Sequence, residues 1–288
     1  MLLRVLYSCG RNIIHSMRTN IKDVSIRTRK VSAILFDLDN TLITTRKSDQ
    51  LTCEKVSEYL QEEYDVPKSK AEAYTRIFLK NFQSCPENSD MSLDQWRLFL
   101  WTQALGSTYT HISDNVYRMW LQLRMTYLLP GAEIWALLHK LQSQYHLGLI
   151  TNGTSRAQWE KIQGLGLQNC FDCILVSGDL PWEKPQKAIF LEACKQLQTE
   201  PEHCLMVGDK LETDICGAML ADIGTTVWVP LTGQQELDPR PDFILNSILE
   251  LPEALHMLSG SKAFSYSHRS VPSPDIKSES SNVCNSLS

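Results

Sequence analysis

The sequence predicts an α/β protein whose core is a Rossmann-like parallel sheet. Between residues 31 and 258, short apolar runs rich in β-branched residues alternate with helical patterns. Strands that alternate with helices build a parallel sheet with helices on both faces. The stretch 46–129 interrupts this alternation with helical patterns and almost no strand signal. We therefore expect an α/β core made of 31–45 and 130–258, with a helical cap, 46–129, inserted after the first strand.

Each expected element follows from its local pattern. The short apolar runs that we assign to strands are 31–36, 147–150, 173–177, 204–207 and 225–229. Apolar residues at helical spacing predict core helices over 133–144, 156–165, 187–198 and 212–221. The same spacing predicts cap helices over 51–64, 70–82, 95–105 and 114–127. Pro130 and Gly131 mark the return to the core, because both residues interrupt regular structure.

Composition excludes several classes of protein. The chain has 288 residues, a net charge of -5 and no long basic run, so we expect no nucleic-acid partner. It has no apolar stretch near the roughly 20 residues that span a bilayer, so we expect no membrane association. Nine cysteines, an odd number, indicate reduced thiols. Cys170 and Cys173 form a lone C-x-x-C, interpreted as small apolar residues before a strand and not as a zinc or redox site.

The two ends of the chain differ from the rest. In residues 1–30, Arg4, Arg11 and Arg18 recur every seven residues opposite an apolar helical face, and acidic residues are almost absent. This composition is typical of a mitochondrial transit peptide. A disordered extension is the alternative, and both interpretations stay open. Residues 259–288 are rich in serine and poor in apolar residues, so we expect a disordered tail.

Polar side chains follow the predicted strands at the points where the strands end. In parallel sheets these ends share one edge, and ligands bind there. The residues at four strand ends are Asp37 and Asp39, Thr151 and Asn152, Lys184, and Asp209 with Asp214. Carboxylates gathered at one edge repel each other unless a cation neutralises them, and oxygen ligands suit Mg²⁺. A fixed lysine with neutral donors beside it suits a phosphate group.

These residues stand in four motifs: F-D-L-D-N-T-L, T-N-G, E-K-P and G-D-x-x-x-x-D. Their order resembles that of the haloacid-dehalogenase-type hydrolases over roughly residues 31–229. The resemblance implies that Asp37 is a nucleophile and a Mg²⁺ ligand. It implies that Asp39 is the general acid and then the general base, with its backbone carbonyl on the metal. The dehalogenases of the superfamily lack an acid at the position of Asp39, so its presence favours phosphate esters.

The remaining roles follow from the same resemblance. Asp209 would ligate Mg²⁺, and Asp214 would support the site from outside the ligand set. The residues that would hold the phosphoryl oxygens are Thr151, Asn152 and Lys184. The implied reaction is hydrolysis of a phosphate monoester through an aspartyl-phosphate.

A narrower resemblance links the chain to the N-acylneuraminate-9-phosphatases. It rests on the stretch 207–228, on the L-I-T-N-G and E-K-P-x-x-x-I-F runs, and on Trp120 with Arg124 in the cap. It implies a cytoplasmic enzyme of sialic acid biosynthesis whose partner is a small phosphorylated sugar acid. Sialic acids carry a carboxylate, for which an arginine is a natural ligand. The cap candidates are Arg46, Arg97, Arg118 and Arg124, and Arg124 is preferred because it also matches the narrower pattern.

Other functions stay open at this point. The same chemistry could act on a smaller sugar phosphate, on 2-phosphoglycolate or on a nucleotide. A catalytically silent phosphate-binding protein is the alternative from another class, but every motif residue is present. The oligomeric state and the choice between cytoplasm and mitochondrion are also open.

Overall fold

The computed structural model describes residues 30–83, 91–231 and 239–260. The basic segment 1–29 and the serine-rich segment 261–288 lie outside these described residues, and with them most of both predicted end segments. Within the described ranges, no helix is both long and apolar enough to cross a bilayer.

The core is a parallel sheet, as the sequence predicts. Its strands are β1 (Ala33–Phe36), β2 (His146–Thr151), β3 (Cys173–Val176), β4 (Cys204–Gly208), β5 (Thr225–Trp228) and β6 (Phe243–Ile244). They lie in the order β3-β2-β1-β4-β5-β6 and every pair is parallel. The chain order reverses between β1 and β4, and a crevice beyond the strand ends at such a point is the usual ligand site of these sheets.

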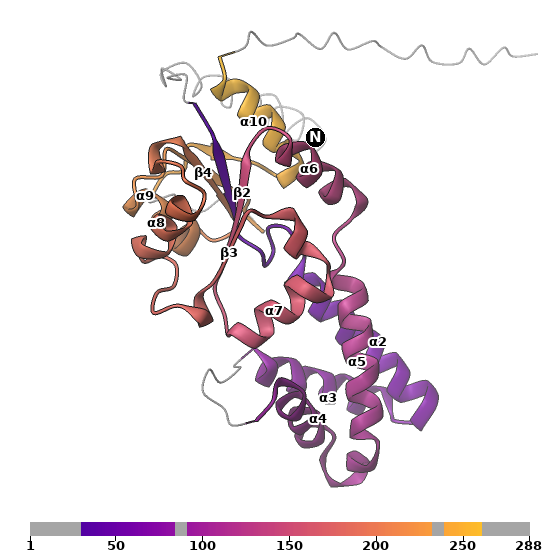
Figure 1. Ribbon diagram of the computed structural model, residues 1–288. Helices are drawn as coiled ribbons and strands as arrows, with labels where there is room; N and C mark the ends of the chain where they lie inside the picture. Colours follow the sequence, from indigo (N-terminus) through magenta and orange to yellow (C-terminus); the bar gives the residue numbers. More distant parts are fainter. Residues whose placement is uncertain (1–29, 84–90, 232–238, 261–288) are drawn as a thin grey trace, which may run out of the picture.

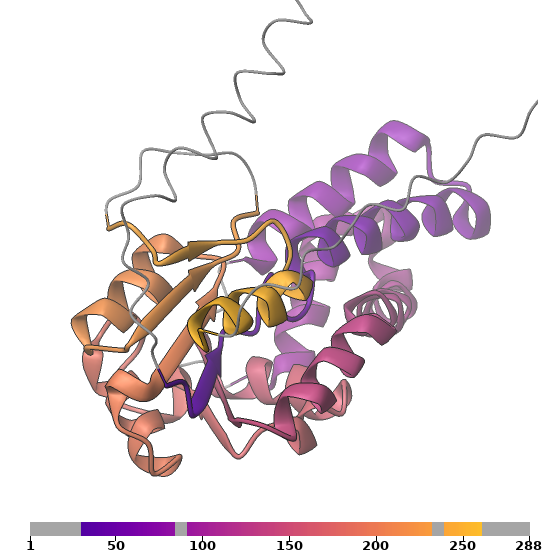
Figure 2. The ribbon, with the colours of Figure 1, turned by 90° about the horizontal axis from the view of Figure 1, so that it is seen from above.

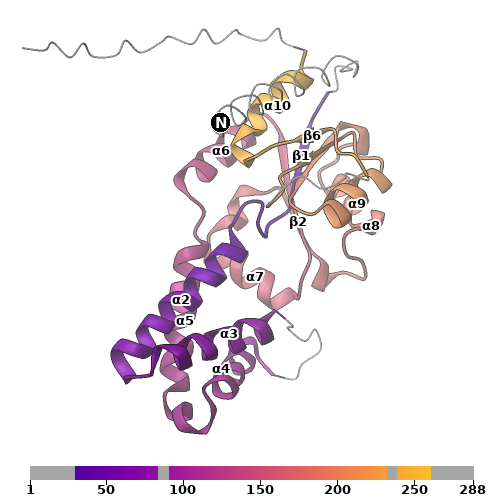
Figure 3. The same ribbon diagram turned by 180° about the vertical axis from the view of Figure 1, so that it is seen from behind.

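Helices cover both faces of the sheet (Figures 1 and 3). One face carries α6 (Ala132–Gln142), α7 (Ser155–Gly164) and α10 (Leu251–Leu258), and the other carries α8 (Lys187–Gln196) and α9 (Cys216–Leu220). Strand β1 serves both faces because successive side chains point to opposite sides. Ile34 and Phe36 pack into the first cluster, whereas Ala33 and Leu35 pack into the second.

A second body follows β1 in the sequence, and we call it the insertion. It consists of α2 (Thr45–Tyr64), α3 (Lys68–Phe82), α4 (Leu93–Tyr109) and α5 (Ser113–Leu128). These helices extend away from the sheet, as the view from above shows (Figure 2). They bury an aromatic cluster of their own, in which the Phe78 and Trp101 ring centroids lie 3.9 Å apart and Trp120 packs edge-on against Phe78.

The structure differs from the expected elements in a few places. Helix α2 begins at Thr45, six residues before the expected start at 51, because its first turns are polar and carry no apolar periodicity. The expected helix over 212–221 is instead a π-helical turn, Leu211–Ile215, followed by the short α9. Strand β6 and helix α10 were not predicted, since two residues of strand and eight of helix leave little pattern.

The lone C-x-x-C is divided between the two faces of the sheet. Cys170 packs in the cluster beneath α6 and α7, whereas Cys173 packs in the cluster beneath α8. Both are buried free thiols. Cys170 lies among apolar side chains, and the Cys173 thiol donates to Gln196 Oε1 at 3.1 Å.

Candidate active site

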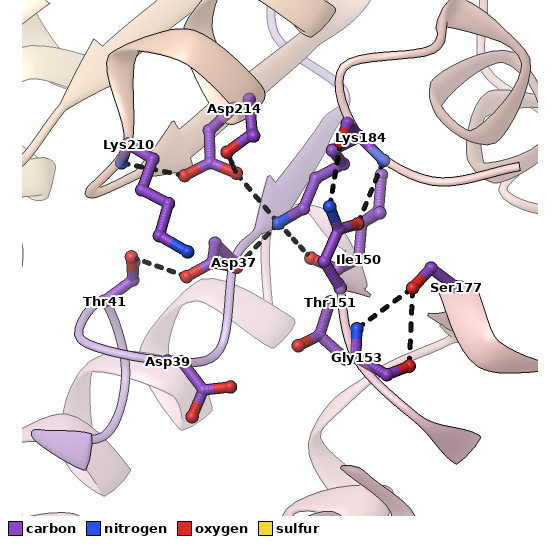
Figure 4. A network of polar contacts seen from close by, with 12 residues as sticks. Asp37, Asp39, Thr41, Ile150, Thr151, Gly153, Ser177, Lys184, Lys210 and Asp214 are labelled. Carbon is purple, nitrogen blue, oxygen red and sulfur yellow. Dashed lines mark hydrogen bonds and ion pairs between the residues drawn. The ribbon is translucent and has the colours of Figure 1, made fainter. Parts of the chain in front are cut away.

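The predicted nucleophile, Asp37, lies directly beyond β1 and is buried. The ammonium of Lys184 lies 2.6 Å from Asp37 Oδ1 and 2.8 Å from Asp214 Oδ1, and it donates to the Ile150 carbonyl at 2.7 Å (Figure 4). The Thr41 hydroxyl donates to Asp37 Oδ2 at 3.1 Å. One lysine thus joins the ends of β1, β2 and β4 and fixes the direction of the Asp37 carboxylate.

Asp214 owes its position to the π-helical turn that follows β4. Its Oδ2 accepts a hydrogen bond of 3.0 Å from the Lys210 backbone N–H. The carboxylate also lies against Gly208, where an added Cβ would be only 2.3 Å from Asp214 Oδ2. Gly208 is therefore required by close packing. Single π-helical turns are rare in proteins, and those that occur often lie at functional sites.

Three carboxylates form a candidate metal centre. Oxygens of Asp37, Asp209 and Asp214 all lie within 4.8 Å of one another, and the three side chains are buried. Asp209 Oδ1 is buried without a hydrogen-bond partner among the described residues. A buried carboxylate oxygen left unpaired is costly, and a divalent cation would satisfy it. The residues present thus fit a hard cation such as Mg²⁺. The Asp39 carboxylate is not part of this trio.

The charges in this cluster shift the titration of its members. Burial raises the pKa of Asp37 to about 7, with Asp214 adding to the rise and Lys184 opposing it. Burial also raises the pKa of Asp209 to about 6, helped by Asp214. Burial alone would lower the pKa of Lys184, but Asp214 and Asp37 outweigh it and raise that pKa above its ordinary value. Without a cation, ionisation of Asp37 and Asp209 is therefore unfavourable.

These shifts predict a pH-dependent response to metal. Asp37 and Asp209 bind protons more tightly in the folded chain than in the unfolded one, so the metal-free protein loses stability as pH rises from about 4 to about 7. A cation that replaces those protons removes the loss. In thermal melts we expect Mg²⁺ to raise the midpoint more at about pH 8 than at about pH 5. A Mg²⁺ effect that is equal or smaller at the higher pH would contradict this.

The predicted phosphate-binding residues Thr151, Asn152 and Lys184 lie together at the ends of their strands, and two of them have side-chain partners of their own. Asn152 uses its amide to hold the Lys184 backbone: its Nδ2 donates to the Lys184 carbonyl at 2.8 Å, and its Oδ1 accepts from the Lys184 N–H at 2.9 Å. It therefore positions Lys184 in this structure. Thr151 is fully buried, and its hydroxyl accepts a 2.7 Å hydrogen bond from Gln158. Gly153, at φ +136°, leaves room for that glutamine.

Asp39 is turned away from the Asp37 carboxylate (Figure 4). The Lys161 ammonium lies 2.6 Å from both of its carboxylate oxygens, and Gln158 and Thr45 donate to it at 3.0 Å and 2.5 Å. Burial acts to raise the pKa of Asp39, but Lys161 and these hydrogen bonds hold it well below its usual range.

Sequence reasoning missed these partners of Asp39. Gln158 and Lys161 stand three residues apart on α7 and therefore share one face of the helix. That spacing, directly after the T-N-G motif, is the signal that could have found them. Thr45 begins α2, where the sequence offered no sign of a helix start.

The four cap arginines separate into different environments. Arg97 is 1% exposed and grips Glu160 of α7 with both terminal nitrogens, at 2.7 and 2.6 Å, so it links the insertion to the core. Arg124 is also buried, and its Nε donates to Asp49 at 2.7 Å. The other two are Arg46, which is exposed, and Arg118, which is exposed and pairs with Asp114.

A parallel sheet with a nucleophilic carboxylate, a bridging lysine and clustered acids at its edge defines a class of hydrolases. The sequence model of the haloacid dehalogenase-like hydrolases matches residues 34–228. The chain belongs to this family. Its relatives include phosphatases, which supports a phosphatase activity.

The comparisons give individual relatives. N-acylneuraminate-9-phosphatase of Rattus norvegicus is 32% identical over 236 residues, covering 80% of this chain and 95% of that protein. Glyceraldehyde 3-phosphate phosphatase of Pyrococcus furiosus is 30% identical over 246 residues, covering 81% of this chain and 96% of that protein. Among solved structures, a phosphatase of this family from Thermococcus onnurineus has a TM-score of 0.53 and 26% identity, covering 78% of this chain and 98% of that one.

Proposed function

We propose that this chain hydrolyses phosphate monoesters through a phosphorylated Asp37. The observation that carries the proposal is the position of the Lys184 ammonium. It lies 2.6 Å from Oδ1 of the buried Asp37 and 2.8 Å from Oδ1 of the buried Asp214, beyond the carboxyl ends of the strands. A carboxylate is a weak nucleophile, but an acyl-phosphate intermediate replaces one difficult hydrolysis by two easier steps. The Lys184 charge lowers the repulsion that an anionic nucleophile meets at a phosphate.

The two steps use the same pair of carboxylates. An Asp37 oxygen forms a bond to phosphorus and the bond from phosphorus to the leaving oxygen breaks. Asp39 gives that oxygen a proton, which Asp39 must first take up from solvent, because Lys161 holds its carboxylate ionised in this structure. Water then forms a bond to phosphorus while the Asp39 carboxylate takes its proton. The bond between Asp37 and phosphorus breaks, and inorganic phosphate leaves. Proton transfer of this kind typically contributes about 10²–10⁴ in rate.

We propose Mg²⁺ as the cofactor. Asp37 and Asp209 would hold the ion, and the unpartnered Asp209 Oδ1 supports this choice. When bound, Mg²⁺ supplies charge neutralisation at the phosphoryl group. Asp39 would join the ligands only through its backbone carbonyl, as its side chain is engaged elsewhere.

For the substrate we propose N-acylneuraminate 9-phosphate, which would place the enzyme in sialic acid biosynthesis. The proposal is supported by the likeness to N-acylneuraminate-9-phosphatases, which extends through the insertion and over nearly their whole length. Arg124 remains the candidate ligand for the substrate carboxylate. A smaller ester is the second candidate, because the glyceraldehyde 3-phosphate phosphatases reach similar identity.

Phosphate release over a panel of esters tests the reaction and the substrate together. The panel contains N-acetylneuraminate 9-phosphate, glyceraldehyde 3-phosphate, 2-phosphoglycolate and a nucleoside monophosphate, each assayed with Mg²⁺ and with EDTA. We expect the sialic acid phosphate to have the highest kcat/KM, and all activity to require Mg²⁺. A preference for a small ester would overturn the substrate, and equal activity in EDTA would overturn the metal.

Arg124 allows a sharper test of substrate choice. Arg124→Ala should lower kcat/KM for the sialic acid phosphate by about tenfold to hundredfold, the value of one charged hydrogen bond, and hardly change that for phosphoglycolate. Because Arg124 is buried against Asp49 and lies over the Phe82 ring, Arg124→Lys is needed as a milder variant, and both are checked by thermal melting. Arg118→Ala, on an exposed face of the same helix, is the matched control. An equal loss on both substrates would make Arg124 structural.

The location of the enzyme stays a proposal. We propose the cytoplasm, with mitochondrial import through the basic N-terminal segment as the alternative. A fluorescent reporter fused behind residues 1–30 decides between them. Diffuse fluorescence supports the cytoplasm, and mitochondrial fluorescence that is lost after Arg4, Arg11 and Arg18 are changed to Glu supports import.

A further inference from the structure

Two buried thiols meet beneath the connection between α8 and β4. Cys194 lies in α8, Cys204 begins β4, and their sulfurs are 3.5 Å apart. The two residues are 3% and 1% exposed, and both belong to the cluster on the α8 face of the sheet. Asp209 follows the other end of β4, so the pair lies away from the active site and the proposed mechanism uses neither thiol.

The chain between the two cysteines folds back on itself and keeps their sulfurs in contact. The Thr199 N–H donates to the Cys194 carbonyl at 3.0 Å, and the Cys204 sulfur lies 3.5 Å from the Glu200 carbonyl. Among the described residues, no other pair of cysteine sulfurs is in hydrogen-bond contact. The sulfurs of a disulfide are about 2 Å apart, so these two must approach by about 1.5 Å to bond.

The pair is buried, but the segment that covers it is at the surface. No residue from 198 to 203 is buried, and local opening of such a segment admits small molecules without unfolding the domain. When Cys204 keeps its proton and donates it to Cys194, that hydrogen bond lowers the pKa of the Cys194 thiol. The same contact and burial raise the pKa of Cys204. Because the thiolate is the reactive form, Cys194 is the sulfur that reacts first.

We propose that Cys194 and Cys204 are a site of reversible oxidation, which forms a disulfide in response to a peroxide. The Cys194 sulfur bonds to one peroxide oxygen, the O–O bond breaks, and the released hydroxide takes a proton and leaves as water. The Cys204 sulfur then bonds to the Cys194 sulfur, the S–O bond breaks, and a second water leaves with the Cys204 proton. Two thiols are oxidised and one peroxide is reduced. This inference does not depend on the proposed phosphatase activity.

The disulfide should stabilise the core without changing the chemistry. It ties the end of α8 to the start of β4 and closes the loop 194–204. Such a cross-link acts mainly by restricting the unfolded chain, so we expect the melting midpoint to rise by about 4–10 °C. Phosphate release should change by less than about twofold, because β4 meets the active site at its other end.

Mass spectrometry of the full chain tests the pairing directly. The reduced, folded protein is treated with a small excess of hydrogen peroxide, alkylated in denaturant and digested with trypsin. Lys195 lies between the two cysteines, so they fall in different peptides, 188–195 and 196–210, and each peptide holds one cysteine. We expect these two peptides to be joined. Dithiothreitol should separate them and return the midpoint to its starting value, whereas it would not reduce oxidised methionine.

Two variants show whether the rise in midpoint comes from this pair. Cys204→Ser should abolish the joined peptides and the rise. Cys53→Ser is the matched control, because Cys53 is also buried but lies in the insertion, and it should leave both unchanged. The joined peptides are measured on the unchanged chain, so the test stands even if Cys204→Ser does not fold.

Three results would overturn the proposal. The peptides stay separate after peroxide treatment, or Cys194 is joined instead to Cys173 of the same cluster. In the third, the joined peptides form only when urea is present during oxidation, which would make the pairing a property of the unfolded chain.

Discussion

Asp37→Asn is expected to lower phosphate release by at least about 10³-fold while the protein stays folded, because the change removes the nucleophile and keeps its size. Lys184 loses one partner but keeps Asp214 and the Ile150 carbonyl. Burial already penalises the charged form of Asp37, so its neutral replacement should not lower the melting midpoint in EDTA.

The intermediate gives a second measurement for this variant. Acid quenching of the wild-type reaction should trap a protein whose mass is increased by one phosphoryl group, and the Asp37→Asn variant should show none. Asp222→Asn is the matched control, because Asp222 is exposed and lies outside the site. Its φ of 56° suits asparagine as well as aspartate. Activity of Asp37→Asn within tenfold of the wild type would exclude the covalent route.

Asp209→Ala is expected to raise the Mg²⁺ concentration for half-maximal activity by at least about tenfold, since a hard cation loses a charged oxygen ligand. In contrast to the loss of Mg²⁺ affinity, the stability of the metal-free protein should not fall. Asp209 Oδ1 is buried without a partner among the described residues, so truncation removes an unsatisfied atom. The midpoint in EDTA should therefore stay level or rise, while the gain on adding Mg²⁺ shrinks.

Glu212→Ala is the control for this experiment. Glu212 is exposed, carries the same charge and lies three residues further along the chain. If both variants weaken the Mg²⁺ dependence equally, the cause is the general field of the acidic edge and not coordination by Asp209. If Asp209→Ala alone lowers the EDTA midpoint sharply, the side chain is structural.

Much of the fold was predictable because its pattern is local. The apolar runs that became β1 to β5 end within two residues of the expected positions, since buried parallel strands are nearly continuous in apolar residues. The family and the fold class are confirmed. The residues at strand ends could be located for the same reason: once the strands are placed, a shared edge for Asp37, Lys184 and Asp209 follows from the parallel arrangement.

What escaped prediction depends on contacts between distant segments. Lys161 reaches Asp39 across 122 positions of sequence, and Arg97 reaches Glu160 across 63. Neither pairing leaves a local pattern. The contact of the Asn152 amide with the Lys184 backbone, 32 positions away, likewise leaves no local pattern. A residue type shows what a side chain can bind, whereas the fold decides which partner comes within reach.

The aromatic cluster that is confined to the insertion bears on how proteins of this family diversify. Phe78, Trp101 and Trp120 pack among themselves, while the sheet is stabilised by different side chains on its own two faces. These clusters share no member, and away from the Arg97–Glu160 link we expect substitutions in one to act almost independently of the others on stability. Substitutions within the helical body can thus accumulate without disturbing the carboxylate edge that carries Asp37, Asp209 and Asp214. Relatives named for a nine-carbon acid phosphate and for a three-carbon phosphate are what such modularity would produce.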